Sequence, residues 1–224
     1  MFIALYALAG AWRPAHLPAA TMVQLEMVHP DLSSLPPNSV CPGYTLRSFR
    51  AGDEDGWCAC FAQWAQPGED YRENWTHEKL RGWLGATEGS RIGNPENLLF
   101  AVCDADQSIC STACAWTTDT HAEDMGELGW VAGVDHHRGK GLGHLVTIGV
   151  LHRIRELGKA RARLNTDDWR VPAIKAYLKM GFKPDHTHES HAERWQALHK
   201  IIDSGQTVAN VAPPPPPQQG GSKL

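Results

Sequence analysis

The six residues Arg138–Gly143 read RGKGLG, with three glycines at alternate positions. Glycine adopts backbone conformations that other residues avoid, and it lets a ligand approach the main chain closely. The segment lies between a predicted strand at residues 126–134 and a predicted helix at residues 141–158. Backbone N–H groups at the start of a helix lack intrahelical partners, and the helix dipole adds positive potential there. These features predict a cradle for a pyrophosphate group.

Two better-known phosphate loops fit this segment poorly. A P-loop requires Ser or Thr directly after its Gly-Lys pair, whereas Lys140 is followed by Gly141. A dinucleotide loop of the pattern G-x-G-x-x-G, counted from Gly139, would need glycine where His144 stands. That fold also needs further strand–helix units downstream, for which few residues remain. An ordinary tight turn is the plain alternative, although turns rarely need three glycines beneath a helix.

The spacing of apolar residues predicts the elements that must position this loop. Alternation or short apolar runs predict strands at residues 44–50, 97–102, 109–116, 126–134, 161–166 and 182–184. Helical spacing predicts helices at residues 53–65, 76–84, 141–158, 171–180 and 191–203. Over residues 44–184 the order is β-α-α-β-β-β-α-β-α-β. This order predicts an α+β fold, with helices flanking a mixed, mostly antiparallel sheet.

The two ends of the chain differ in composition from the central region. Residues 1–39 contain five prolines and no sustained period, which predicts an N-terminal extension without structure before a domain at 40–204. Residues 205–224 contain a proline run and paired glycines, so we expect a disordered tail. The final tripeptide Ser222-Lys223-Leu224 is the peroxisomal address in eukaryotic cells. We therefore expect a cytoplasmic protein, or a peroxisomal one if the source is eukaryotic.

The composition excludes several classes of partner. The chain is 42% hydrophobic and 21% charged, as in soluble globular proteins. A formal net charge of −4 gives no electrostatic reason to expect nucleic acid. The apolar run at residues 1–12 is too short to span a bilayer, so we expect no membrane partner. The six cysteines and twelve histidines show no zinc spacing, which predicts free thiols and no metal.

Two segments together resemble a known family. The segment WVAGVDHHRGKGLGHLVTIGVL at residues 130–151 is similar to the acyl-CoA-binding motif of the GNAT superfamily of N-acetyltransferases, whose signature is Q/R-x-x-G-x-G/A. The segment AIKAYLKMGF at residues 173–182 resembles the family's A-x-x-x-Y-x-x-x-G-F helix-to-strand segment. The resemblance covers about residues 44–184 and is specific for 125–182. It implies direct transfer of an acetyl group from acetyl-CoA to a primary amine.

The resemblance also implies roles for individual residues. The strand before the loop splays from its neighbour at a bulge in this family, and its backbone pairs with the pantetheine arm; the matching residues are Val131, Ala132 and Gly133. The amides that would hold the pyrophosphate are those of Arg138, Gly139, Lys140, Gly141, Leu142, Gly143 and His144. Tyr177 matches the tyrosine that often protonates the departing thiolate. Glu127 stands eleven residues before Arg138, the offset of the basic glutamate in histone-type members.

The reaction needs such groups on chemical grounds. Attack on a thioester requires a neutral amine, and a free amine is mostly protonated at neutral pH, so a base assists. The leaving thiolate needs a proton donor, and the tetrahedral oxyanion needs an amide donor. Strand alternation would place Glu127 on the face of Gly129 and Val131. The plain alternative for Glu127 is a strand carboxylate paired with a Lys or Arg.

Two positions depart from the family pattern. Arg170 stands where the family usually has Asn, three residues before Ala173. The segment after Pro184 predicts a loop and a helix in place of the usual final hairpin strand. Four tryptophans fall in or near the first two predicted helices. We expect most of them in the core and one or two beside the acceptor: Trp57, Trp64, Trp75 and Trp83.

Two other functions stay open at this point. The first is a CoA-binding sensor or partner module without turnover, and the second is a dinucleotide-binding oxidoreductase. The sequence does not identify the acceptor, which would be a small-molecule or peptide amine. Amino acids, polyamines, aminoglycosides, aminothiol sugars and protein N-termini all satisfy the motif.

Overall fold

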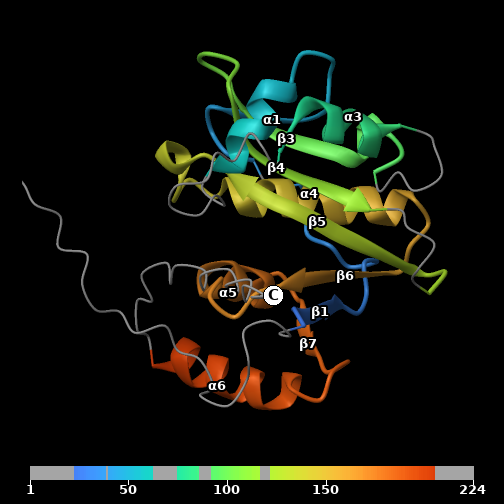
Figure 1. The fold of residues 1–224 in the computed structure, drawn as a ribbon, viewed down its shortest axis with the longest axis vertical. Helices are drawn as coiled ribbons and strands as arrows, with labels where there is room; N and C mark the ends of the chain where they lie inside the picture. The colour runs from blue at the N-terminus through green and yellow to red at the C-terminus, as the bar shows by residue number, and fades with distance from the viewer. Residues whose placement is uncertain (1–22, 39, 63–74, 86–91, 117–121, 205–224) are drawn as a thin grey trace, which may run out of the picture.

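The computed structural model describes residues 23–38, 40–62, 75–85, 92–116 and 122–204. Within these residues seven strands form one sheet, in the order β2-β3-β4-β5-β6-β1-β7 (Figure 1). Neighbouring strands are antiparallel, except that β5 and β6 are parallel. The predicted mixed, mostly antiparallel sheet with flanking helices is therefore confirmed.

The elements follow the predicted order closely. The strands are β1 (Leu25–His29), β2 (Tyr44–Ser48), β3 (Leu98–Cys103), β4 (Ile109–Trp116), β5 (Met125–Gly133), β6 (Arg161–Thr166) and β7 (Lys183–Asp185). The helices are α1 (Glu54–Cys60), α3 (His77–Leu84), α4 (Leu142–Glu156), α5 (Val171–Lys179) and α6 (His191–Asp203), with the 3-10 turns η3 (Pro95–Asn97) and η4 (Asp135–His137). The sequence predicted the bounds of β4, β6 and α6. None of the helices in the described ranges is long and apolar enough to cross a membrane.

The prediction of an extension without structure over residues 1–39 is wrong for Leu25–His29. These residues form β1, which lies between β6 and β7 in the sheet. Side chains of β1 alternate between buried and partly exposed, the period of a strand with one covered face. The folded domain therefore begins before residue 40. Residues 1–22, Trp64 and the tail with its final tripeptide lie outside the described residues.

Helices cover both faces of the sheet (Figure 1). The two cores differ in composition. Helices α4, α5 and α6 share one core with the sheet, built mainly from aliphatic side chains such as Leu128, Ile148 and Ile174. Helices α1 and α3 share the other core with β3 and β4, and it is centred on Trp57 and Phe61. We call these two sides the aliphatic face and the aromatic face.

Helix α4 is buried on more sides than an amphipathic surface helix. Nine of its fifteen residues are buried. A Cβ added at Gly149 would lie 2.6 Å from a methyl carbon of Leu46, so β2 packs directly against the helix backbone. The chain between β1 and β2 contacts both ends of the helix: the Leu32 N–H donates to the Ala160 carbonyl, and Cys41 lies near Gly141. These contacts hold the start of α4, and thus the glycine loop, in place.

Candidate functional site

The glycine loop connects β5 to α4 and leaves its main chain open. Gly141 is the N-cap of α4, and residues 138–141 are exposed. Gly139 and Gly141 have φ of +76° and +80°, the left-handed region that favours glycine. A Cβ added at Gly139 or Gly143 would meet no atom within 4 Å. The chain therefore leaves room for a ligand to approach these amides.

The start of α4 is electrostatically suited to an anion. The N-cap makes no side-chain hydrogen bond, and the first turn of α4 carries no acidic residue. The first N–H groups of a helix have no carbonyl partner within it, and the helix dipole makes this end positive. Arg138, Lys140 and the exposed His144 lie on the same short segment. The predicted pyrophosphate residues thus lie together in a geometry that fits this group.

Tyr44 braces the glycine loop from β2, at the far edge of the sheet. Its hydroxyl accepts a hydrogen bond from Nζ of Lys140 at 2.9 Å and lies 2.8 Å from Nδ1 of His137. The bond to Tyr44 raises the pKa of Lys140, whereas desolvation and the neighbouring Lys140 charge lower the pKa of His137. A neutral His137 with its proton on Nε2 accepts a hydrogen bond from the Tyr44 hydroxyl, so the three side chains form one hydrogen-bonded group. No local sequence pattern marks Tyr44, because its partners are 93 and 96 residues away.

Strands β5 and β6 separate after three registered pairs. Residues Met125–Glu127 pair with residues Arg161–Arg163, and no later pair joins the two strands. Strand β6 continues along β1 as far as Thr166, while β5 continues along β4 as far as Gly133. The two strands diverge from this point (Figure 1). Their separation is the splay that the family resemblance implied beside the predicted pantetheine residues.

A β-bulge at Trp130 interrupts the pairing of β5 with β4. Cys114 pairs with Gly129 but Thr112 pairs with Ala132, so β5 carries one extra residue. Trp130 has a φ of +50°, which is rare for a bulky side chain. The extra residue reverses the alternation: Trp130 packs on the aromatic face and Val131 on the aliphatic face. The prediction that Val131 shares a face with Glu127 is therefore wrong.

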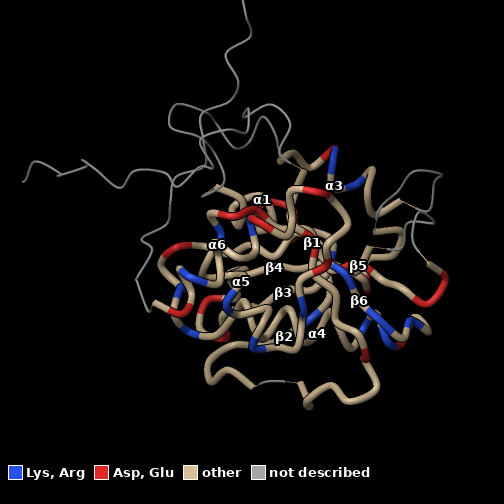
Figure 2. Tube along the Cα trace, turned by 90° about the horizontal axis from the view of Figure 1, so that it is seen from below, with Lys and Arg blue, Asp and Glu red and all other residues tan. Residues whose placement is uncertain are grey.

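Glu127 is buried on the aromatic face, where β5 and β6 part. Its neighbour Leu128 faces the aliphatic core, and only 5% of Glu127 is exposed. Its carboxylate lies 3.6 Å from Nε of Arg163 and accepts a hydrogen bond from Asn165 at 3.4 Å. Arg163 also binds Glu26 of β1 at 3.1 Å. Acidic and basic residues accordingly lie side by side where β1, β5 and β6 meet (Figure 2).

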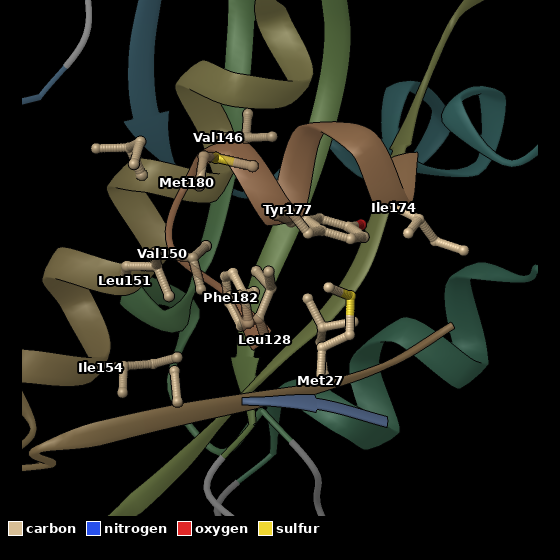
Figure 3. Packing of buried hydrophobic residues seen from close by; sticks show 14 of the residues in the cluster. Met27, Leu128, Val146, Val150, Leu151, Ile154, Ile174, Tyr177, Met180 and Phe182 are labelled. Atoms are coloured by element: carbon tan, nitrogen blue, oxygen red, sulfur yellow. The ribbon is translucent and has the colours of Figure 1, made fainter. Parts of the chain in front are cut away.

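Tyr177 lies on the opposite, aliphatic face. Its ring contacts Phe182 edge-on at 5.8 Å between centroids, and its hydroxyl points away from Phe182 (Figure 3). Burial raises the pKa of Tyr177 to about 12, although the charge of Arg170 acts in the other direction. Arg170 itself is the N-cap of α5 and binds Asp167 at 3.0 Å. The phenol therefore keeps its proton at ordinary pH.

Glu127, at the splay, and Tyr177 thus lie on opposite faces of the sheet. Leu128 follows Glu127 in β5 and packs in the same core as Tyr177 (Figure 3). An acyl transfer needs a base on the side of the attacking amine and a donor on the side of the leaving group, which this arrangement offers. Across the described ranges, no three His, Cys, Asp or Glu side chains gather as a metal-ion site would require.

Comparison with known proteins decides the family. The sequence model of the acetyltransferase (GNAT) family matches residues 54–182 of the chain. The chain belongs to the GNAT acetyltransferase family. The matched region of this GNAT chain runs from α1 to the end of α5, so it contains the splay, the glycine loop and Tyr177. Strand β1 and helix α6 lie outside the matched region.

Relatives of this GNAT chain include proteins named mycothiol acetyltransferase. The one from Thermomonospora curvata is 32% identical over 181 residues, which cover 78% of this chain and 56% of the relative. The one from Acidothermus cellulolyticus is 27% identical over 197 residues, covering 77% and 58%. The chain spans about half the length of these curated relatives. A GCN5-related N-acetyltransferase from Sphaerobacter thermophilus shares the fold, with a TM-score of 0.53 at 21% identity over 72% of this chain and 49% of that chain.

Proposed function

We propose that this GNAT domain transfers an acetyl group from acetyl-CoA directly to a primary amine, without a covalent enzyme intermediate. The observation that carries the proposal is the placement of two features along β5. Its first half ends at the splay between Glu127 and Arg163, and its second half leads into the open glycine loop. Acetyl-CoA is a long molecule that carries its anionic pyrophosphate and its reactive thioester far apart. It therefore requires the glycine loop and the splay to lie along one strand.

Acetyl-CoA would lie along β5, with its pyrophosphate on the loop. The amides from Arg138 to Gly143 would bind the pyrophosphate, and Lys140 would be held for it by Tyr44. The edge of Val131–Gly133 on the splay side would contact the pantetheine arm. From Gly133 to Gly129 the strand rises by roughly 13 Å, which brings the thioester toward the bulge. The bulge re-aims a backbone amide toward the thioester oxygen, where an oxyanion develops.

The proposed chemistry is one displacement at the thioester carbon. The amine nitrogen forms a bond to the carbonyl carbon, the carbon–sulfur bond breaks, and the sulfur leaves as a thiolate. Glu127, on the aromatic face, takes the proton that the amine loses, directly or through a bridging water. Tyr177, on the aliphatic face, donates its hydroxyl proton to the thiolate. The acid and the base act on opposite sides of the sheet, so they do not neutralise each other.

The acceptor is proposed to be a small molecule. Relatives that carry the name mycothiol acetyltransferase support a small acceptor in kind. They do not identify the acceptor of this chain, because the chain spans about half of their length.

The experiment is an assay of thiol release from acetyl-CoA with a panel of primary amines, with mass spectrometry of the product. We expect one N-acetylated amine for each thiol released, at rates well above hydrolysis. Acetyl-CoA binding without acetylation of any amine would contradict the proposal and favour a sensor module. Binding of NAD in place of CoA would favour an oxidoreductase, for which this mostly antiparallel sheet lacks the doubly wound topology.

A further inference from the structure

Among the described residues of the aromatic face, six aromatic side chains form one network of ring contacts. Trp57 and Phe61 are fully buried and form the back of the cluster. The remaining four are partly buried indoles. Among them, Trp130 contacts each of the other three: its ring centroid lies 4.2 Å from that of Trp83, 5.1 Å from that of Trp116 and 5.8 Å from that of Trp75. We call these four side chains (Trp75, Trp83, Trp116 and Trp130) the indole wall.

The backbone of Trp130 is strained to place its indole there. A left-handed φ of +50° would suit glycine, yet the chain carries the largest side chain at this position. The bulge turns this indole toward the aromatic face, whereas regular alternation from Glu127 would have turned it toward α4. Strain of this kind occurs at ligand sites, where the surrounding structure maintains it.

Trp116 connects the indole wall to the carboxylate of Glu127. The two residues are direct partners across β4 and β5. The indole Nε1 of Trp116 would lie 2.4 Å from a Cβ at Gly129, so the ring covers the backbone between Glu127 and Trp130. The wall and the carboxylate are therefore continuous, and they span roughly 10 Å of strand.

An aliphatic core would stabilise this face of the sheet equally well, because the opposite face is packed in that way. What indoles add is a flat surface that stacks on rings and whose electron-rich faces attract cations. Trp83 and Trp130 are only partly buried, and Trp130 lies three residues along β5 from the proposed base Glu127.

We infer that the acceptor is a primary amine carried on a ring, which stacks on the indole wall while its amino group lies near Glu127. This inference rests on the proposed function and names the class of its acceptor. The ring is an aryl group or a sugar, because both present an apolar face. Linear polyamines and alkylamines lack that face and are poor acceptors.

The test compares kcat/KM for tryptamine, phenethylamine and glucosamine with the values for hexylamine and spermidine. At least one ring amine exceeds both linear amines by about tenfold or more, as one good stack provides. Trp130→Leu lowers kcat/KM for that ring amine about tenfold more than it lowers kcat/KM for hexylamine. Trp130→Phe keeps a ring and retains most of the preference.

Two further variants guard against a trivial result. Trp83→Leu removes a second indole of the wall from α3 and gives the same selective loss, which covers the case in which Trp130→Leu does not fold. Trp195→Phe changes a tryptophan in the aliphatic core and leaves the ring preference unchanged.

The outcomes separate this inference from the proposed function. Preference for linear amines, or an unchanged preference in both wall variants, overturns the ring acceptor while leaving acetyl transfer intact. Absence of transfer to any amine overturns the proposed function. In that case, calorimetry with tryptamine and CoA decides the site itself: binding that Trp130→Leu abolishes supports it, and no binding overturns it.

Discussion

The two faces of the sheet are built from different side chains around the same strand. On the aliphatic face β5 packs against α4 and α5 through Leu128, and on the aromatic face it packs through Trp130. The glycine loop and Tyr177 belong to the elements of the aliphatic face, whereas Glu127 and the indole wall belong to the aromatic face. We propose from this difference that elements of the aliphatic face bind the acetyl donor and that the aromatic face selects the acceptor.

Tyr177→Phe is expected to lower turnover more than any other variant proposed below. The change removes one hydroxyl from the aliphatic face and keeps the ring that packs on Phe182. We expect turnover to fall about tenfold to ten-thousandfold, the span of general acid–base catalysis, with little change in acetyl-CoA affinity. Steady-state thiol release and calorimetry measure the two quantities. Full turnover in the variant would show that solvent protonates the thiolate.

The same variant gives a stability test of the buried phenol. Because the pKa of Tyr177 is raised to about 12 when folded, the folded state holds this proton more tightly than the unfolded state. The resulting stability is present below the unfolded pKa of about 10 and is lost as the pH rises toward 12. Tyr177 should contribute a fall of about 1.4 kcal/mol per pH unit to the unfolding free energy in that window. Tyr177→Phe should therefore decline less steeply than wild type by that amount, because burial also raises the pKa of the Cys60 and Cys114 thiols, which contribute to both proteins.

Gly143→Asp should weaken acetyl-CoA binding about tenfold to hundredfold while leaving the fold stable. Gly143 lies in the first turn of α4, where a negative charge stabilises the helix dipole but repels a pyrophosphate. The variant should therefore be at least as stable as wild type, so lost binding is not misfolding. Gly143→Asn has the same shape without the charge, and the difference between the two affinities in calorimetry measures the electrostatic part. If Gly143→Asp and wild type bind acetyl-CoA with equal affinity, the pyrophosphate lies elsewhere.

Two glycines of β5 offer a matched comparison of the faces. A Cβ at Gly126 would lie 2.4 Å from a methyl carbon of Ile154, and a Cβ at Gly129 would lie 2.4 Å from Nε1 of Trp116. Alanine at either position should destabilise the fold by about 1–3 kcal/mol, because both sites are overpacked. Denaturant unfolding checks this. Only Gly129→Ala should also raise the KM for the acceptor; an equal rise in both variants would refute a face-specific role.

Glu127→Gln should have the smallest effect. The amide keeps the shape but removes the base, so we expect the rate to fall several-fold. The fall should be largest at low pH, where fewer acceptor amines are neutral. A pH–rate profile of both proteins measures it, with Glu26→Gln as the control, since Glu26 binds the same Arg163 from β1. If both variants retain full activity at every pH, Glu127 is a structural partner of Arg163.

The local parts of the site were predictable from sequence, and the long-range parts were not. The glycine loop, helix α4 and the segment around Tyr177 are each marked by a pattern of residues close together in the sequence. Glu127 and Asn165 lie 38 residues apart, and no local pattern reports their contact. Strand β1 does alternate, but prolines on both sides obscured a run of five residues.

The family resemblance implied a bulge in this strand, but the residue pattern did not place it at Trp130. Left-handed positions are usually marked by glycine, as at Gly139 and Gly141, and here the position is held by tryptophan. Its strain is maintained by ring contacts with Trp83 and Trp116, which come from other elements. One extra residue then changes the face of Val131, so a prediction from strict alternation fails from this position onward.

The most direct test of the division between the faces is a crossed kinetic measurement. The KM for acetyl-CoA and the KM for the best amine are determined for wild type, Gly143→Asp and Trp130→Leu. The account predicts a crossed result: Gly143→Asp raises only the KM for acetyl-CoA, and Trp130→Leu raises only the KM for the amine. If both variants raise the same KM, or both raise the two together, the faces do not divide donor from acceptor.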